Sequence, residues 1–305
     1  MSFVPHPIPY QGSKRALAAL ILQYLPSDAA RLIEPFAGSA AVSLAALQAG
    51  LVHSVMLNDI NRPLMELWKA IFEHPEELSE RYSALWNEQA GQERVFYDTV
   101  RMRFNRDHQP ADFLYLLARC VKASVRYNRN GDFNQSPDNR RRGRHPSAMK
   151  HDIVATSQLL RGRAQLFSLD YKEIVNQANP KDVLYLDPPY QGVSAKRDPR
   201  YVEAVAYDSL VETLSMMKDK ASSFILSYDG KTGEKAFGQN LPAALNLTLL
   251  EIDAGVSSQA TLLGRRERTT EFLYLSPALV ERLGTDFSMS LNSDYKQLPL
   301  FEALP

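Results

Sequence analysis

The sequence LIEPFAGSAAV, residues Leu32–Val42, begins as an apolar strand, turns at Gly38, and continues as a run of small residues suited to a helix. The first amides of such a helix are free to hold the carboxylate of a bound amino acid, and Phe36 is expected to lie beside that ligand. A strand that passes through a glycine turn into a helix is typical of α/β folds that bind nucleotide-like ligands. This stretch therefore predicts the fold class and the position of a ligand site.

Short apolar runs that read as strands alternate with helical patterns along much of the chain. The candidate strands are Arg31–Glu34, Ser54–Asn58, Ala164–Leu169, Asp182–Leu186, Ser223–Ser227, Leu247–Ile252 and Glu271–Leu275. The candidate helices between them include Ser39–Gln48, Arg62–Phe72 and Ser209–Lys220. This order predicts an α/β fold with a mostly parallel sheet covered on both faces, in which ligands bind at the carboxyl ends of the strands.

The strand pattern is interrupted between residues 63 and 161. That segment reads as helices followed by Tyr127–Gly143, a polar stretch rich in glycine and arginine. We expect residues 1–62 and 162–285 to form one domain around the sheet. Residues 63–161 are expected to form a mainly helical insert in that domain.

Composition sets the outer limits on function. The chain has 305 residues, of which 45% are hydrophobic, and its 35 Lys and Arg balance 35 Asp and Glu, so an anionic partner would need a local basic cluster. Cys120 is the sole cysteine, which excludes an internal disulfide and favours a buried thiol, and the six histidines show no metal-like spacing. The proline-rich start lacks the apolar core of a signal peptide, and no stretch approaches the ~20 apolar residues of a membrane span. We expect a soluble cytoplasmic protein.

The motif Asp187-Pro188-Pro189-Tyr190 follows the apolar strand Asp182–Leu186. Two consecutive prolines remove two backbone donors, so the carbonyl groups around them can accept other hydrogen bonds. The Asp187 carboxylate and the Pro188 carbonyl could accept both N–H bonds of an adenine amino group, which favours a pyramidal nitrogen whose lone pair faces a methyl donor. Tyr190 would stack on the base, which requires a base outside the double helix. An ordinary turn after a strand is the alternative interpretation.

Asp59 follows the candidate strand Ser54–Asn58, about 20 positions past the turn at Gly38. An acid at this place can accept the two hydroxyls of a ribose. A nicotinamide cofactor would satisfy the pattern nearly as well as S-adenosylmethionine. The lack of a full Gly-x-Gly-x-x-Gly run and the motif at Asp187 favour S-adenosylmethionine.

The order of these motifs resembles that of the Dam-type, α-group DNA adenine methyltransferases over nearly the whole chain. The matching parts are Tyr10-Gln11-Gly12-Ser13-Lys14, Glu34–Val42, Asp59, Asp170, Asp187–Tyr190, Arg126–Asn134, Ser227-Tyr228-Asp229, and Arg265 with Glu271-Phe272-Leu273. The resemblance implies a Rossmann-like class I methyltransferase sheet with an inserted, mainly helical target-recognition domain. It also implies site-specific methylation of adenine N6 in duplex DNA with S-adenosylmethionine, by an orphan enzyme or by the modification enzyme of a restriction-modification system.

The resemblance assigns roles to single residues. It implies catalysis by Asp187, Pro188, Pro189 and Tyr190. It implies cofactor binding by Tyr10, Gly12, Lys14, Glu34, Phe36, Gly38, Asp59, Asp170 and Asp187. Ala40 departs from the family pattern, because it replaces the second glycine of Phe-x-Gly-x-Gly. We expect Ala40 to lie inside the helix with a negative φ, where alanine causes no strain.

A basic cluster lies within the candidate insert. Between Arg119 and Lys150, nine basic residues stand against Asp132 and Asp138, a local charge of +7. Such a cluster in a neutral chain is the footprint expected for phosphates, with Tyr127 and Phe133 available to fill the gap left by a flipped base, although a solvated loop is the simpler alternative. Asparagine and arginine can also read base edges in the major groove. DNA contacts are expected of Lys122, Arg126, Tyr127, Arg129, Asn130, Phe133, Asn139, Arg140, Arg141, Arg142 and Arg144.

Other functions share this chemistry. A cytosine amino group, RNA or a glutamine side chain are alternative acceptors, and a catalytically inactive DNA-binding homologue is an alternative of another class. The basic cluster favours DNA, and the intact Lys14, Asp59 and Asp187 favour an active enzyme.

The tail, residues 286–305, turns polar and contains the apolar block Gln297-Leu298-Pro299-Leu300-Phe301. This block resembles the peptide by which bacterial replication and repair proteins dock on the sliding clamp. Leu298, Leu300 and Phe301 would be its apolar anchors, and Gln297 would fix its orientation. Packing of the block on the protein's own core is an equally good interpretation.

Overall fold

The computed structural model describes residues 3–189, 205–232, 235–237, 239–256 and 268–292. Tyr190 of the expected catalytic motif, Arg265 and the apolar block Gln297–Phe301 lie outside these residues. The fold and the site are therefore described without these residues.

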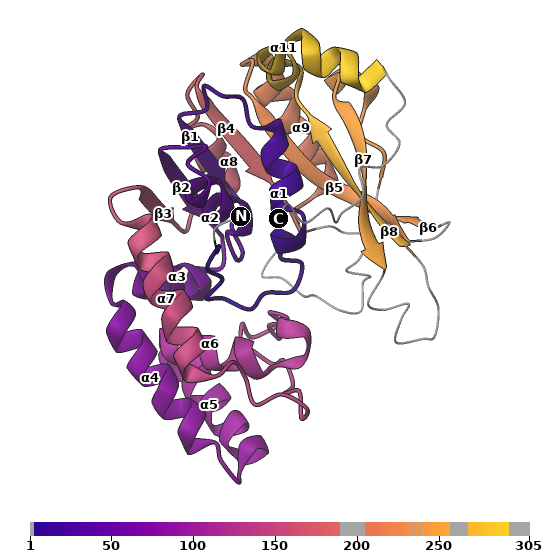
Figure 1. The fold of residues 1–305 in the computed structure, drawn as a ribbon. Coiled ribbons are helices and arrows are strands. Elements are labelled where there is room, and N and C mark those ends of the chain that lie inside the picture. Colours follow the sequence, from indigo (N-terminus) through magenta and orange to yellow (C-terminus); the bar gives the residue numbers. More distant parts are fainter. Residues whose placement is uncertain (1–2, 190–204, 233–234, 238, 257–267, 293–305) are drawn as a thin grey trace.

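Within the described chain, eight strands form one mixed sheet (Figure 1). They are β1 (Arg31–Glu34), β2 (Ser54–Asn58), β3 (Ala164–Phe167), β4 (Asp182–Leu186), β5 (Phe224–Thr232), β6 (Lys235–Phe237), β7 (Thr248–Val256) and β8 (Arg268–Leu275). Their order is β3-β2-β1-β4-β5-β8-β7, and β6 pairs with β5. The pairs from β3 to β5 are parallel, whereas β8 is antiparallel to both of its neighbours. The strand order reverses between β1 and β4, which is where ligands bind in open α/β sheets.

The central strands bury both of their faces. Leu32 and Val183 belong to one buried cluster, whereas the next residues along their strands, Ile33 and Leu184, belong to the other. Successive side chains of a strand point to opposite faces. A strand covered on both faces reads as a continuous apolar run, which is why β1 and β4 are visible in the sequence.

Helices form a layer on each face of the sheet (Figure 1). The cluster that contains Leu32 includes residues of α1 (Ala18–Ile21), α2 (Ala41–Gln48), α3 (Arg62–Glu73), α7 (Pro146–Leu160) and α11 (Pro277–Asn292). The cluster that contains Ile33 includes residues of α8 (Tyr171–Val175), α9 (Tyr207–Asp219) and the 3₁₀ turn η4 (Ala243–Leu245). The other 3₁₀ turns in the described residues are η1 (Lys14–Ala16), η2 (Leu22–Tyr24) and η3 (Val121–Ala123). No helix among the described residues has the length and apolar character needed to span a membrane.

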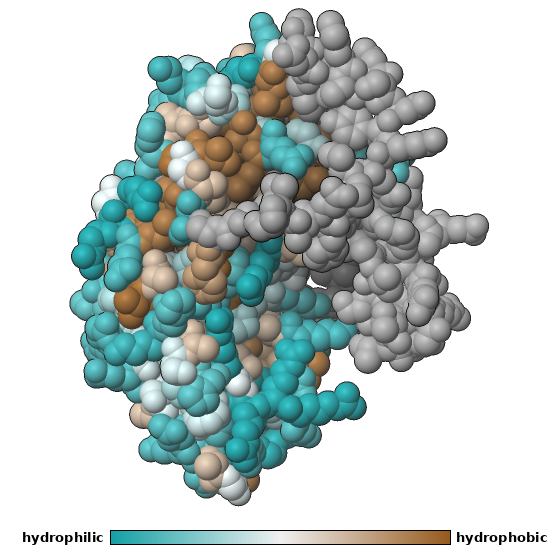
Figure 2. Space-filling view, viewed as in Figure 1, coloured by the Kyte–Doolittle hydropathy of each residue, from teal (hydrophilic) through white to brown (hydrophobic). Residues whose placement is uncertain are grey.

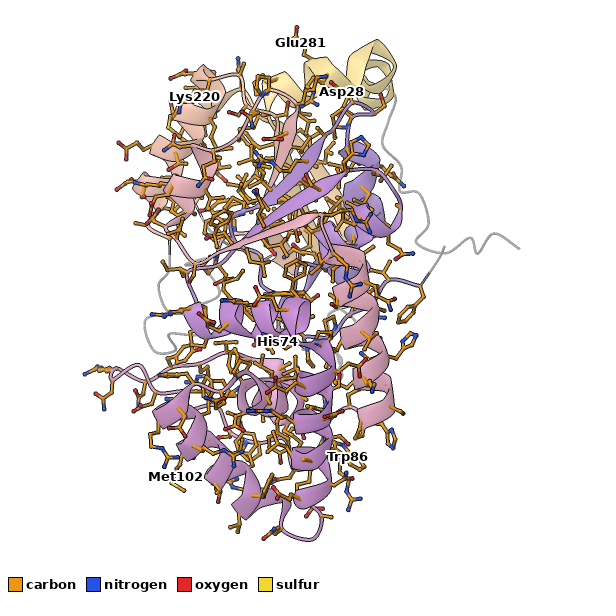
Figure 3. The ribbon with its side chains drawn as sticks, turned by 90° about the vertical axis from the view of Figure 1, so that its left-hand side faces the viewer. Asp28, His74, Trp86, Met102, Lys220 and Glu281 are labelled. Carbon is orange, nitrogen blue, oxygen red and sulfur yellow. The ribbon has the colours of Figure 1, made fainter. Side chains whose placement is uncertain are left out.

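The remaining helices extend from one layer away from the sheet. They are α4 (Pro75–Glu88), α5 (Glu93–Asp107) and α6 (Pro110–Arg119). His74 lies where this part meets α3, and Trp86 and Met102 lie farther from the sheet (Figure 3). The buried cluster continues without a break from Leu32 in the sheet to Tyr97 on α5. The visible face of this helical part is mostly hydrophilic, as Figure 2 shows. A domain boundary at residues 63 and 161 stays a prediction.

The strand bounds test the sequence analysis directly. Three predicted strands, now β1, β2 and β4, have the predicted bounds. The predicted strand Ala164–Leu169 ends at Phe167, because the amide of Leu169 donates to the side chain of Asn58 rather than to the sheet. The predictions near the carboxyl end found β5, β7 and β8 but not their extensions, and they missed β6.

The prediction for Ala40 is wrong. Ala40 precedes the first turn of α2 as its N-cap residue, with φ 48° and ψ 34°, in the left-handed region. Its amide donates to the Ala37 carbonyl, which closes the turn, and its own carbonyl accepts from Leu44. The family's second glycine fits this backbone without strain, whereas alanine is strained there by about 1 kcal/mol.

Ala40→Gly is expected to change the free energy of unfolding by less than about 1 kcal/mol. Glycine relieves the left-handed strain, but it also removes a fully buried methyl group worth about 0.8 kcal/mol. Ala40→Val should destabilise by at least about 2 kcal/mol, because a β-branched side chain is poorly tolerated at positive φ and would overfill the site. Urea unfolding of both variants is the measurement, and equal stability of wild type and Ala40→Val would contradict the left-handed backbone.

Candidate active site

A pocket of about 560 Å³ opens at the carboxyl ends of β1, β2 and β4. Its walls come from the N-terminal segment, the turn after β1, the loops after β2 and β4, the start of α8, and β8. The expected catalytic and cofactor residues that the structure describes all line it: Tyr10, Gly12, Lys14, Glu34, Phe36, Gly38, Asp59, Asp170, Asp187, Pro188 and Pro189. The volume is in the range of sites that enclose ligands of cofactor size.

The ammonium group of Lys14 lies between two carboxylates. Its Nζ is 2.9 Å from Oδ1 of Asp187 and 3.9 Å from Oε2 of Glu271 on β8. Burial raises the pKa of Glu271, the Lys14 ammonium opposes this, and the nearby Asp187 carboxylate adds to the rise. The Lys14 side chain is only 10% exposed, so the group of three charges is screened less than a surface ion pair. The sequence placed Glu271 in a late motif but gave it no role in the site.

Glu34 holds the start of α2. Its Oε1 accepts the Ser43 amide at 2.7 Å, and the residue is 2% exposed. Burial raises the pKa of the Glu34 carboxyl to about 8, against the lowering effect of the hydrogen bonds from Ser43. The expectation that the first amides of this helix are free is therefore wrong at Ser43, because a carboxyl of the chain itself takes that amide.

Asp59 is held by two main-chain amides. Its Oδ2 accepts the Gly38 amide at 3.1 Å, and its Oδ1 accepts the Asn61 amide at 2.9 Å. Burial raises the pKa of the carboxyl to about 6, and the two amides limit that rise. The carboxylate is thus fixed in the pocket wall beside the glycine turn.

The aromatic walls of the pocket come from Tyr10 and Phe36. The ring of Phe36 lies 5.0 Å from that of Tyr171, at an angle of 34°. The ring of Tyr10 covers Gly38, whose φ is 49°, and a Cβ added there would lie 3.1 Å from Cε1 of Tyr10. Both the left-handed backbone and the close ring therefore favour glycine.

Asp170 occupies the N-cap of α8 at the edge of the pocket. Its Oδ1 accepts the Lys172 amide at 2.8 Å, and the residue is exposed. The carboxylate thus has a structural role as a cap in addition to any contact with a ligand.

Two side chains that support the site were missed in the sequence analysis. The buried amide of Asn58 donates to the carbonyls of Pro35 and Leu169, and its oxygen accepts the Leu169 amide. Trp68 Nε1 donates to the Gly38 carbonyl at 2.9 Å. The one sequence signal for Asn58 is a polar residue at the end of an otherwise apolar strand.

Side chains of the helical part anchor the main chain of the basic loop, residues 140–144. The Tyr82 hydroxyl donates to the Arg144 carbonyl at 2.7 Å, and Gln89 Nε2 donates to the Arg142 carbonyl at 3.0 Å. Asn139, Arg140, Arg141 and Arg142 are exposed. Arg141 pairs with Asp138, and Arg142 pairs with Glu93.

The DNA contact expected of Arg144 stays a prediction, and the surroundings of this side chain weigh against it. Its guanidinium pairs with the buried carboxylate of Asp152 on α7 and donates to the His6 carbonyl at 3.1 Å. An arginine that compensates a buried carboxylate cannot leave it without a cost of several kcal/mol. Arg119, counted in the local charge, is also only 2% exposed. The basic surface is thus smaller than the sequence suggested.

The segment Arg126–Asn134 forms a hairpin with an exposed tip. Tyr127 and Phe133 pair as an antiparallel bridge, and Asn128 closes the turn by accepting the amides of Asn130 and Asp132. Arg129 and Asn130 are exposed at this tip, Lys122 is exposed on η3, and Arg126 is half-buried. Exposed residues on a turn held by its own hydrogen bonds are suited to contact a partner.

The prediction that Phe133 enters DNA is corrected. Phe133 is 1% exposed and packs edge-on against Phe104, Phe113 and Tyr127. Removing it from this cluster would expose a large apolar ring and leave a cavity. Tyr127 is half-buried, and its hydroxyl donates to Oδ1 of Asn61 at 3.0 Å.

Most of this chain is similar in sequence to known proteins. A family model described as D12 class N6 adenine-specific DNA methyltransferase matches residues 10–251. The retron Ec67 DNA adenine methylase of Escherichia coli is 31% identical over 189 residues, which are 60% of this chain and 62% of that protein. The DNA N-6-adenine-methyltransferase of Escherichia phage P1 is 30% identical over 190 residues, which are 60% of this chain and 23% of that protein. The type II methyltransferase M.MjaIII of Methanocaldococcus jannaschii is 25% identical over 198 residues, 60% of this chain and 68% of that protein. The chain thus covers less than two thirds of the first two relatives.

Glu34→Gln is expected to remove a pH dependence of stability. The folded protein keeps the Glu34 proton up to a pKa of about 8, whereas an unfolded glutamate releases it near about 4.3. The folded state binds more protons in this window, so the free energy of unfolding of the wild type falls as pH rises, by up to about 1.4 kcal/mol per pH unit. Glutamine does not titrate and keeps an oxygen for Ser43.

Urea unfolding between about pH 5 and pH 8 measures this difference. The matched control is Glu173→Gln at an exposed position of α8. Wild type and Glu34→Gln curves that stay parallel across the window would contradict the buried, protonated carboxyl.

Proposed function

The chain belongs to the D12 class N6 adenine-specific DNA methyltransferases, and we propose that it transfers a methyl group from S-adenosylmethionine to N6 of an adenine in duplex DNA. The observation that carries the proposal is the position of Asp187, held by Lys14 beside a pocket that also contains Asp59 and Glu34. Such a group of ionisable residues at the strand-order reversal of an α/β sheet is suited to a small polar ligand and a reacting group together.

The volume and the lining residues of the pocket support S-adenosylmethionine as the cofactor. Its volume suits a ligand of that size, and its two aromatic walls, Tyr10 and Phe36, can enclose the apolar parts of one. Asp59 is fixed beside the glycine turn, where its carboxylate can accept ribose hydroxyls. Asp170 at the far edge can accept from an adenine amino group. When bound, the cofactor supplies a methyl group on a sulfonium, which is open to direct displacement.

The Asp187 carboxylate and the Pro188 carbonyl would accept the two N–H bonds of the target amino group. Their attraction grows as positive charge develops on the nitrogen during the transfer, so they lower the barrier rather than only bind the substrate. Lys14 offsets part of the negative charge of Asp187 and Glu271 and holds Asp187 in place. Tyr190 is proposed to stack on the base.

The base has to leave the double helix to reach this pocket. An adenine paired in a duplex keeps its amino group within the stack, so we infer base flipping, at a cost of a few kcal/mol. The exposed basic residues of the loop at Arg140 and of the hairpin tip at Arg129 are proposed to hold the phosphates on either side. A protein with this substrate would act on DNA in the cytoplasm, as a solitary enzyme or beside a nuclease. Docking of Gln297–Phe301 on a sliding clamp is a separate proposal that rests on sequence alone.

Asp187→Ala is expected to reduce methylation below about 1% of wild type while DNA affinity changes by less than a few-fold, because the carboxylate meets the reacting amine and no phosphate. Transfer of labelled methyl groups to DNA and fluorescence anisotropy measure the two quantities. The control is Asp219→Ala, which removes an exposed carboxylate at the end of α9. Mapping of modified adenines in DNA from cells that express the wild type also identifies the target sequence. Turnover retained by Asp187→Ala would remove this residue from the chemical step.

The double variant Arg140→Ala, Arg141→Ala is expected to weaken DNA binding and to lower the slope of log affinity against log salt by up to about two units. Both side chains are exposed on the anchored basic loop. The control, Arg81→Ala with Arg94→Ala, removes two arginines from surface ion pairs on α4 and α5. An unchanged slope in the loop variant would place the phosphate contacts elsewhere.

A further inference from the structure

The hairpin Arg126–Asn134 contacts the sheet domain through Tyr127. The hydroxyl of Tyr127 donates to Oδ1 of Asn61, in the loop that joins β2 to α3, at 3.0 Å. On its other side the ring lies edge-on to Phe133, with centroids 6.1 Å apart. Burial raises the pKa of the Tyr127 phenol well above its usual value, so its hydroxyl stays a donor at neutral pH. The contact thus joins the packed core of the hairpin to the sheet.

Asn61 extends this contact into the pocket. It is 4% exposed, so its side chain and main chain are held together by the surrounding structure. The main-chain amide of Asn61 donates to Oδ1 of Asp59 at 2.9 Å, and Oδ2 of Asp59 accepts the main-chain amide of Gly38 at 3.1 Å. A continuous series of hydrogen bonds therefore runs from Tyr127 through Asn61 and Asp59 to the glycine turn.

The two ends of this series face different ligands under the proposed function, on which the inference rests. The outer end carries the exposed tip residues Arg129 and Asn130. The inner end, Asp59, lines the pocket. We propose that Tyr127 is a positioning residue that couples DNA contact at the hairpin to cofactor binding at Asp59, so that each ligand tightens the binding of the other.

The physical basis is the cost of ordering. DNA that immobilises the hairpin tip also restrains Tyr127, and through Asn61 it limits the remaining displacements of Asp59 before the cofactor arrives. The cofactor then loses less free energy in ordering its own site, and thermodynamic linkage requires the same gain for DNA when the cofactor binds first. A tyrosine that instead left Asn61 to fill a gap in the DNA would loosen Asp59, and DNA would weaken cofactor binding. Tighter cofactor binding in the presence of DNA supports the positioning role of Tyr127, whereas weaker cofactor binding supports its entry into DNA.

The test uses the full chain, S-adenosylhomocysteine as the non-reacting probe, and a duplex that carries the mapped target sequence. The dissociation constant of S-adenosylhomocysteine is measured with and without saturating duplex, for wild type, Tyr127→Phe and Tyr97→Phe. Tyr97→Phe is the matched control, since it removes a hydroxyl that donates to Gln135 within the helical part. We expect the duplex to tighten the probe by at least about 5-fold in wild type and in Tyr97→Phe. In Tyr127→Phe the ratio of the two dissociation constants should fall below about 2-fold, whatever the affinity of each ligand alone.

Three results would overturn the inference. They are full coupling in Tyr127→Phe, an equal loss of coupling in Tyr97→Phe, and a duplex that has no effect on the probe or weakens it in wild type. Failure of the proposed function looks different, because DNA from cells that express the wild type would then contain no methylated adenine to map.

Discussion

The side-chain amide of Asn58 fixes the carboxyl ends of β1, β2 and β3 relative to one another. Its nitrogen donates to Pro35 at 2.9 Å and to Leu169 at 3.0 Å, and its oxygen accepts the Leu169 amide at 2.9 Å. A buried polar group that is fully bonded makes a strong and specific joint, whereas a partly bonded one is costly. The three segments that meet here lead directly into the glycine turn, Asp59 and Asp170. The pocket is therefore positioned by one side chain that contributes no charge to it.

The sequence predicted the elements that depend on local patterns and missed what depends on contacts between distant segments. The strands β1, β2 and β4 were found with their bounds because strands buried on both faces are continuous apolar runs. The prediction of a negative φ for Ala40 was wrong because Ala40 lies directly before α2, and a sequence pattern does not fix the first residue of a helix. The charges of the insert were counted correctly, yet a count cannot show that Asp152 lies opposite Arg144. Phe133 was assigned to a surface for the same reason.

The helical part and the sheet behave as neighbouring layers of one core. Tyr97 on α5 and Leu32 on β1 belong to the same buried cluster. The N-terminal segment crosses between them, since the His6 amide donates to Asp152 on α7 and the segment continues to Lys14 beside Asp187. The segment is thus held at two places, one in the helical part and one beside the pocket. The position of Lys14 beside the pocket thus depends on contacts made far from the pocket.

The pairing of β1 with β4 has a consequence for biosynthesis. Arg31 at the start of β1 pairs with Asp182 at the start of β4, 151 residues later in the chain. A nascent chain therefore carries an edge of β1 without its partner until the intervening helices have emerged, which takes roughly 8 to 30 seconds at the usual rates of translation. Contacts of such sequence separation also slow folding, since loop closure precedes any gain from pairing. During that interval the apolar strand is open to pairing with other chains, and assistance by chaperones should matter most before β4 is made.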